Sequence, residues 1–233
     1  TILRQLSAMR SFFKHLTRRK IIPADPMQLI QSPKKPQSIP KALEYAQVVR
    51  LIESPDITEY LGVRDRVILE LFYSSGLRVA ELVDLNREDF DPHGCWLRVR
   101  GKGKKERLIP MTQGAAKWIE RYLDHPERHL STDLHQKQAD PQAIFLNKFG
   151  KRITTRSVAR RLKEYLIKAN LVGNITPHTI RHTIATHWLE KGMDLKTIQT
   201  LLGHKSVSAT TIYTKVSPQL KKRVYDESHP RAK

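Results

Sequence analysis

The sequence predicts a mainly α-helical protein with one small antiparallel β-sheet. Apolar residues recur at helical spacing along most of the chain. The segments 95–100 and 106–110 instead resemble two strands, joined by a tight turn with glycines at 101 and 103. Pro33, Pro36 and Pro40 lie in a basic stretch, where they forbid helix and favour an extended linker. We therefore predict a domain at 1–31, a linker at 32–40 and a second domain at 41–233.

Residues 1–31 are predicted to be the C-terminal part of a helical domain. An apolar stripe at helical spacing runs along 1–19, interleaved with Arg4, Arg10 and Lys14. The stripe consists of Ile2, Leu3, Leu6, Met9, Phe12, Phe13 and Leu16. One helix cannot bury such a stripe alone, so we expect this domain to be incomplete in the chain.

The first half of the second domain is predicted from its apolar faces and its helix ends. A helix with Val67 and Leu71 on its inner face ends at Gly76, a residue typical of helix C-termini. A short helix begins near Arg78, and the hairpin follows it. Beyond the hairpin we expect a helix at 113–124, an irregular surface loop at 125–142 and a third strand at 143–146.

The second half is predicted to contain only helices. A long helix covers 155–169 and carries a basic outer face. Three capped helices follow, opened by Thr176 with Pro177, by Asp194 and by Ser206. A short amphipathic helix from Pro218 ends the chain, with the apolar residues Leu220, Val224 and Tyr225.

The composition indicates a polyanionic partner. The chain has 42 Lys and Arg against 23 Asp and Glu, a formal net charge of +19. Nucleic acid is the first candidate, because each cation placed on a phosphate releases a counterion. An anionic membrane surface is the second, but no run approaches the roughly 18 apolar residues of a spanning helix and no signal peptide is visible. The single Cys95 allows no internal disulfide and is compatible with a reducing cytoplasm.

Six residues have the chemistry needed to break a phosphodiester bond. They are Arg78, Lys102, His178, Arg181, His204 and Tyr213. Two arginines can clamp the charge that develops on the non-bridging oxygens. Tyr213 would act as the nucleophile, helped to lose its proton by a neighbouring histidine and the positive field. Lys102, at the tip of the hairpin, is the natural proton donor to the leaving 5′ oxygen.

Five short segments containing these residues closely resemble the tyrosine recombinases. They are GLRVAEL at 76–82, GKGKKER at 101–107, TPHTIRH at 176–182, LLGHK at 201–205 and TTIYT at 210–214. Their order and spacing agree with the family throughout. The ending HPRA at 229–232 further resembles the Xer recombinases of bacteria. The resemblance extends over 1–233, and no catalytic position departs from the pattern.

The resemblance implies a role for each of these residues. Arg78 and Arg181 match the phosphate-clamping arginines, and Lys102 matches the hairpin lysine that acts as the acid. His178 resembles the histidine that serves as base or hydrogen-bond partner, His204 the second histidine, and Tyr213 the nucleophile. Glu81 matches an acidic position that supports the site by holding one arginine. Members of the family need neither metal nor ATP, so no cofactor is expected.

The resemblance also implies the partners. Double-stranded DNA would lie in a clamp formed by the two domains, with four protomers, identical or shared with a sister recombinase, exchanging strands in pairs. A DNA translocase could act as an activator, and the C-terminal helix would dock into a neighbouring protomer. Further DNA contacts are expected from Lys104, Lys105 and Arg107 on the hairpin and from Thr154, Thr155, Arg156 and Arg160 on the helix at 155–169. The expected location is the cytoplasm, on the nucleoid.

Several alternatives remain open. A regulator that kept the fold but lost catalysis would have no use for all six residues. An enzyme like the type IB topoisomerases would use similar chemistry but act alone. His178 and His182 have a spacing that suggests zinc, but Thr179 and Ile180 occupy the place where metalloproteases carry a carboxylate. We therefore expect no metal. The function predicted is site-specific recombination, serving chromosome dimer resolution or the integration and excision of DNA.

Overall fold

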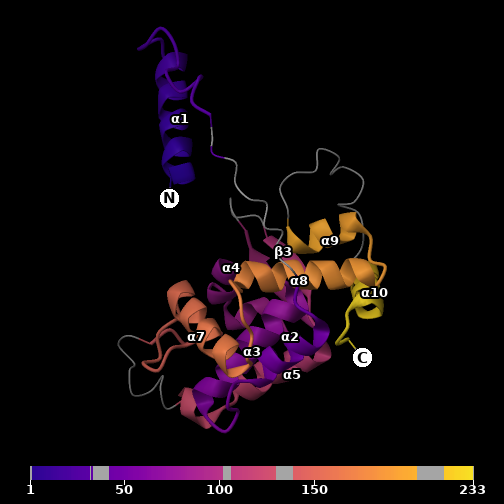
Figure 1. The fold of residues 1–233 in the computed structure, drawn as a ribbon. Helices are drawn as coiled ribbons and strands as arrows, with labels where there is room; N and C mark the ends of the chain where they lie inside the picture. Colours follow the sequence, from indigo (N-terminus) through magenta and orange to yellow (C-terminus); the bar gives the residue numbers. More distant parts are fainter. Residues whose placement is uncertain are drawn as a thin grey trace. The chain divides into compact units, whose positions relative to one another are not determined.

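The computed structural model describes residues 2–31, 33, 42–101, 106–129, 139–203 and 218–232. The chain divides into two compact units, Thr1–Ile39 and Pro40–Lys233 (Figure 1). The boundary falls at the end of the proline-containing segment. Helices predominate and the one sheet is small, as the sequence predicts, so the fold class is confirmed.

The first unit consists of α1 (Ile2–Arg18) and a segment that folds back along it. Arg10 on α1 donates a hydrogen bond to the carbonyl of Ile30, and Met27 is buried. No residue of α1 itself is buried, and Phe12 is 57% exposed. The described part of this unit therefore leaves the apolar stripe of α1 largely uncovered.

The second unit is built around α3 (Tyr60–Ser75), which is buried on nearly every side. Three helices pack against it: α2 (Tyr45–Glu53), α5 (Gln113–Leu123) and α8 (Pro177–Glu190) (Figure 1). The charged residues of α3 are accommodated because they are paired. Arg66 lies 3.0 Å from Glu70, and a similar contact joins Arg64 to Asp65.

The sheet has three antiparallel strands in the order β1 (Phe90–Asp91), β2 (Trp96–Arg100) and β3 (Glu106–Pro110), and η1 (Arg87–Asp89) precedes β1. The two predicted hairpin strands are confirmed to within one residue. The prediction of a strand at 143–146 is wrong. These residues are all buried among the helices and form only isolated bridges, Asn86 with Ala143 and Leu146 with Arg152. Because the segment is buried in the helical core, it does not pair with the sheet as a further strand.

The prediction of an irregular loop at 125–142 is also wrong in part, because residues 126–129 are helical. Arg128 of this turn is buried and donates a 2.6 Å hydrogen bond to the carbonyl of Ala143. The turn is therefore held against the core. The polar composition of 125–142 does not reveal this contact, because the carbonyl that Arg128 binds lies 15 residues further along the chain.

Most helix ends agree with the predicted caps. α3 ends at Gly76 with φ of 57°, and α4 (Val79–Val83) begins directly after Arg78. Thr176 accepts a hydrogen bond at the start of α8, and Asp194 does so at the start of α9 (Leu195–Leu202). The long basic helix is α7 (Thr155–Lys168). The helix predicted after Ser206 lies outside the described residues.

The last helix, α10 (Pro218–Ser228), and the residues after it dock on the end of α3. Tyr225 is fully buried and donates a 2.8 Å hydrogen bond to the carbonyl of Ser74. Arg231 donates to Glu70 at 2.7 Å, so Glu70 is shared by two arginines. None of the helices described here is long and apolar enough to cross a membrane.

Candidate active site

Arg78 is held rigidly at the junction between α3 and α4. Its backbone N–H donates to Glu81 Oε2 at 2.9 Å and its Nη1 donates to Oε1 at 2.7 Å. Its Nη2 donates to the carbonyl of Gly203 at 3.0 Å. The side chain is nevertheless 36% exposed. It is therefore fixed in direction and still open to a ligand.

Arg181 lies one turn into α8 and is buried. Its Nη1 donates to the carbonyl of Gly76, at the end of α3, and its Nη2 donates to the carbonyl of Leu202, at the end of α9. Carbonyls at helix C-termini have no partner within their own helix, so these two are natural acceptors for a guanidinium. Burial, and then the charge of Arg78, lower the pKa of Arg181 to about 10, which leaves it protonated at neutral pH.

The two arginines therefore meet at the end of one helix. Arg78 binds the carbonyl of Gly203, and Arg181 binds that of the preceding residue, Leu202. Gly203 has a left-handed φ of 67°, which turns the chain sharply at this point. Adjacent peptide groups thus set the positions of two permanent cations.

Glu81 is the buried acid of this group. Burial raises its pKa, but the hydrogen bonds from Arg107 and Arg78 outweigh burial, so the pKa lies below its ordinary value. The carboxylate is therefore ionised at neutral pH. The prediction that Glu81 holds one arginine describes only part of its contacts, because it accepts bonds from two.

Arg107 is placed differently from an exposed hairpin cation. Its Nη1 and Nη2 donate to the two oxygens of Glu81, both at 3.0 Å, and its side chain is 19% exposed. The alternation of side chains along β3 indicates this inward position. Arg107 lies on the same face as the buried Ile109, while Leu108 between them is exposed. Because charged residues are frequent in the hairpin, Arg107 is grouped in the sequence-based prediction with its exposed cations.

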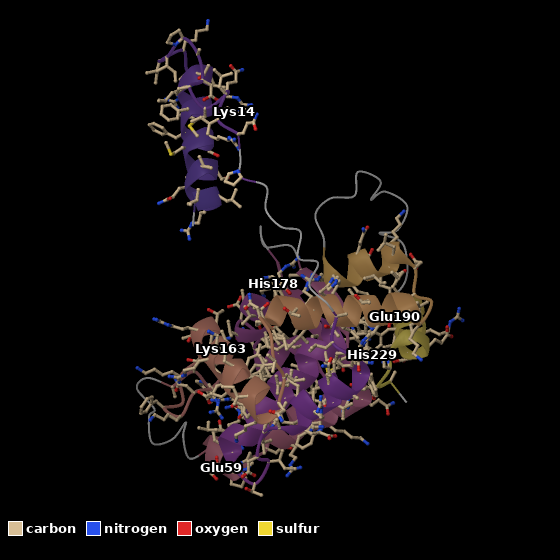
Figure 2. All side chains as sticks on the ribbon, viewed as in Figure 1. Lys14, Glu59, Lys163, His178, Glu190 and His229 are labelled. Atoms are coloured by element: carbon tan, nitrogen blue, oxygen red, sulfur yellow. The ribbon has the colours of Figure 1, made fainter. Side chains whose placement is uncertain are left out.

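His178 lies in the first turn of α8 and is exposed (Figure 2). The spacing of three residues puts it on the same side of the helix as Arg181. Thr176 and Pro177 fix the start of α8 and hence the position of both residues. The exposed imidazole is therefore open to a ligand on the side of α8 that carries Arg181.

Five of the predicted site residues lie outside the described residues: Lys102, Lys104, Lys105, His204 and Tyr213. Their chain neighbours are described for two of the segments. Gly101 ends the first arm of the hairpin, and Gly203, whose carbonyl accepts from Arg78, directly precedes His204. The roles of all five stay predictions.

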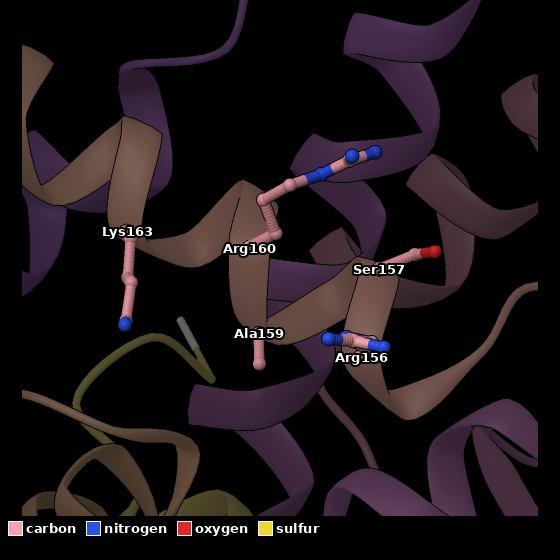
Figure 3. A pocket seen from close by; sticks show the side chains of 5 residues that line it. All are labelled: Arg156, Ser157, Ala159, Arg160 and Lys163. Atoms are coloured by element: carbon pink, nitrogen blue, oxygen red, sulfur yellow. The ribbon is translucent and has the colours of Figure 1, made fainter.

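The predicted DNA-contacting residues of α7 form an exposed group. Thr154 caps the helix by accepting from the backbone of Ser157 at 3.2 Å, and Thr155, Arg156 and Arg160 are exposed. A shallow depression on the helix is lined by Arg156, Ser157, Ala159, Arg160 and Lys163 (Figure 3). Three cations spaced at one helix turn around a hollow surface offer contacts to a row of phosphates.

No group of three His, Cys, Asp or Glu side chains within the described ranges could hold a metal ion. The expectation that catalysis needs neither metal nor cofactor stays a prediction.

Comparison with known proteins identifies relatives of the whole chain. Residues 41–219 match the phage integrase family. The chain is 56% identical over 230 residues to a protein of Chlamydia caviae named tyrosine recombinase XerC, covering 99% of this chain and 72% of that protein. A protein of the same name from Myxococcus xanthus is 45% identical, covering 98% and 76%. The crystal structure of XerA recombinase matches with a TM-score of 0.61 at 30% identity, covering 82% of this chain and 66% of the other.

Proposed function

We propose that this chain, which belongs to the phage integrase family of tyrosine recombinases, cuts and rejoins DNA through a covalent phosphotyrosine on Tyr213. The chain is a site-specific DNA recombinase. The observation that best supports the proposed chemistry is the convergence of Arg78 and Arg181 on successive carbonyls at the end of α9.

The phosphate would bind to the two guanidiniums. Charge accumulates on the non-bridging oxygens as the phosphorus becomes five-coordinate, and planar, permanently charged donors suit it. Both arginines are already anchored to backbone carbonyls, so little reorganisation is needed when the substrate arrives. This arrangement stabilises the transition state rather than the free phosphate.

The reaction would proceed in two balanced steps. The Tyr213 oxygen attacks phosphorus and loses its proton to His178, a new oxygen–phosphorus bond forms, and the bond to the 5′ oxygen breaks while Lys102 protonates that oxygen. In the second step the 5′ hydroxyl of a partner strand loses its proton to Lys102 and attacks phosphorus, while the bond to the Tyr213 oxygen breaks and His178 returns a proton to that oxygen. The energy of the cleaved bond is kept in the phosphotyrosine, so no ATP is consumed. His204 would donate a hydrogen bond to the phosphate beside Arg78.

The biological setting that we propose is chromosome dimer resolution in the cytoplasm, on the nucleoid. Four protomers, identical or paired with a sister recombinase, would assemble on two DNA sites, and a DNA translocase could activate them. The relatives named tyrosine recombinase XerC support this choice over integration of mobile DNA. The buried docking of Tyr225 on Ser74 supplies a socket that the α10 of a neighbouring protomer could occupy.

The proposal is tested by trapping the covalent intermediate. Nicked duplexes with randomised core sequences let the short 5′ fragment diffuse away, so that cleaved strands stay on the protein. In EDTA we expect an adduct with the unchanged chain and none with Tyr213→Phe, which keeps the ring but lacks the oxygen. Sequencing of the trapped DNA then defines the site.

Three other outcomes would contradict the proposal. An adduct that persists in Tyr213→Phe would place the nucleophile elsewhere. Specific DNA binding without any adduct would instead favour a regulator that has lost catalysis, and relaxation of supercoiled DNA by monomers would favour an enzyme like the topoisomerases.

A further inference from the structure

Arg107 connects three parts of the chain that carry the candidate active site. It lies on β3, the second arm of the hairpin that bears Lys102. Its two terminal nitrogens bind the two oxygens of Glu81 on α4, each at 3.0 Å. Its Nε points to the carbonyl of Leu201 on α9 at 3.5 Å, a longer contact than the other two. A single guanidinium thus joins the hairpin to α4 and α9.

The carboxylate of Glu81 is saturated by its donors. Oε1 accepts from Nη1 of Arg78 and of Arg107, and Oε2 accepts from the backbone N–H of Arg78 and from Nη2 of Arg107. Glu81 itself is 6% exposed at the side chain, so water cannot replace a lost donor easily. Removing Arg107 would leave one buried negative charge beside Arg78 alone.

The guanidinium of Arg107 packs so closely against Gly203 that only glycine fits there. A Cβ at this position would lie 2.9 Å from both Cζ and Nε of Arg107, which no ordinary contact allows. The carbonyl of the same residue accepts from Arg78. Arg107 therefore lies directly against the peptide that sets the position of Arg78 and leads to His204.

We propose that Arg107 is a positioning residue of the strand-cleavage reaction. This rests on the proposed function. Arg107 fixes Glu81 and the end of α9, and it offsets the charge of Glu81 so that the charge of Arg78 remains available to the DNA phosphate. A surface cation of the hairpin would only attract DNA, whereas Arg107 acts through Arg78 on the chemical step.

The experiment compares single-turnover cleavage of the trapped site by the unchanged chain and by Arg107→Gln. We expect the cleavage rate at saturating DNA to fall by about tenfold to a hundredfold, less than the loss of a donor that contacts the transition state directly, with DNA affinity nearly unchanged. Arg107→Lys keeps the charge but loses the paired bonds, so it should recover part of the rate. Gly203→Ala should reproduce the loss because its Cβ displaces the guanidinium.

Arg66→Gln is the matched control. Glu70, like Glu81, is a buried carboxylate shared by two arginines, Arg66 and Arg231. Neither of those arginines is placed in the candidate site. Arg66→Gln should lower the melting temperature about as much as Arg107→Gln does, without a comparable fall in the cleavage rate.

A charge test separates positioning from general destabilisation. Glu81→Gln removes the charge that Arg107 offsets, so the double variant Glu81→Gln with Arg107→Gln should cleave faster than the product of the two single effects predicts. A wild-type cleavage rate in Arg107→Gln would overturn the inference. So would equal rate losses in Arg66→Gln and Arg107→Gln, or fully multiplicative effects in the double variant. Failure of the unchanged chain to form any adduct would instead count against the proposed function itself.

Discussion

At the scale of single residues, the candidate site depends on backbone carbonyls as much as on charged side chains. Arg78 and Arg181 are both oriented by the end of α9, and Arg181 also binds the end of α3 at Gly76. Helix C-termini present partially negative carbonyls, and these hold Arg181 without a direct carboxylate partner, whereas Arg78 also pairs with Glu81. The arrangement keeps more cations than anions around the phosphate position.

Gly76 gives a direct test of this role of the backbone. Its φ of 57° is unfavourable for other residues, and a Cβ would lie 2.7 Å from Cδ2 of Leu202. Gly76→Ala should therefore destabilise the fold by about 1–3 kcal/mol, measured by urea unfolding. Because the Gly76 carbonyl accepts from Arg181, cleavage should fall further than stability explains at a temperature where the variant is fully folded. Unchanged cleavage by the folded variant would show that this carbonyl does not position Arg181.

The caps and the turn at Gly76 could be predicted because they depend on local chemistry. Thr176, Asp194 and Gly203 occupy the places where helix ends require them. The partners of Arg107 could not be predicted with the same ease. The position of Arg107 depends on β3 facing α4, a contact between segments far apart in the sequence, although its alternation with Ile109 indicated an inward side chain.

At the scale of elements, α7 and α10 have contrasting surfaces. α7 buries Val158 and Leu162 and exposes arginines around a depression. α10 instead buries Tyr225 and brings the residues after it against α3. One element is suited to bind DNA, and the other is suited to hold protein parts together.

The exposed arginines of α7 should contribute to DNA affinity through phosphates. Replacing Arg156 or Arg160 by Ala should lower the slope of log affinity against log salt by about 1 each, because each contact releases about one counterion. Fluorescence anisotropy over a salt series measures this slope. Lys117→Ala, an exposed cation on α5, is the matched control and should leave the slope unchanged. Equal changes in all three variants would mean that only net charge matters.

His229 should make the docking of the C-terminal segment sensitive to pH. His229 is 4% exposed, its ring centroid lies 4.9 Å from that of Tyr225, and its Nδ1 accepts from the backbone N–H of Arg231 at 3.0 Å. Burial, helped by Arg231, Lys222 and His187, lowers its pKa from 6.5 to about 3. Below pH 6.5 His229 is therefore protonated in the unfolded chain but stays neutral in the folded chain. The free energy of unfolding consequently falls as the pH falls.

The expected loss between pH 7 and pH 5 is about 1–2 kcal/mol in the free energy of unfolding. The loss should be reduced in His229→Phe, which cannot take a proton, even if that variant is less stable at pH 7. His182→Gln, at an exposed position, should keep the pH dependence of the unchanged chain. A pH dependence that persists in His229→Phe would assign it to another group.

At the scale of the whole molecule, the fold class and the helix order follow from the sequence more fully than the small details of the sheet. The sequence predicts the third strand at 143–146, but Phe90–Asp91 provides it. Two residues are too few to show an alternating pattern, and the apolar run at 143–146 is buried by helices instead. A short apolar segment does not reveal from its sequence alone which partner covers it.

The two units should contribute separately to DNA binding. The first carries Arg4, Arg10, Lys14 and further cations, and the second carries the candidate site. A chain reduced to 42–233 should keep one cooperative thermal transition but bind DNA about tenfold more weakly, with a smaller salt slope. Calorimetry and anisotropy measure the two properties. Equal affinity and slope would show that the first unit makes no contact with DNA.

The central claim is that Arg78 and Arg181 clamp the charge of the scissile phosphate. The most direct test replaces one non-bridging oxygen of that phosphate by a methyl group, which removes its negative charge. On the ordinary phosphate, Arg78→Ala and Arg181→Ala should each slow cleavage by about a hundredfold or more. On the methylphosphonate, at least one of the two variants should recover to within about tenfold of the unchanged chain, because less charge must be stabilised. Equal penalties on both substrates would contradict the clamp.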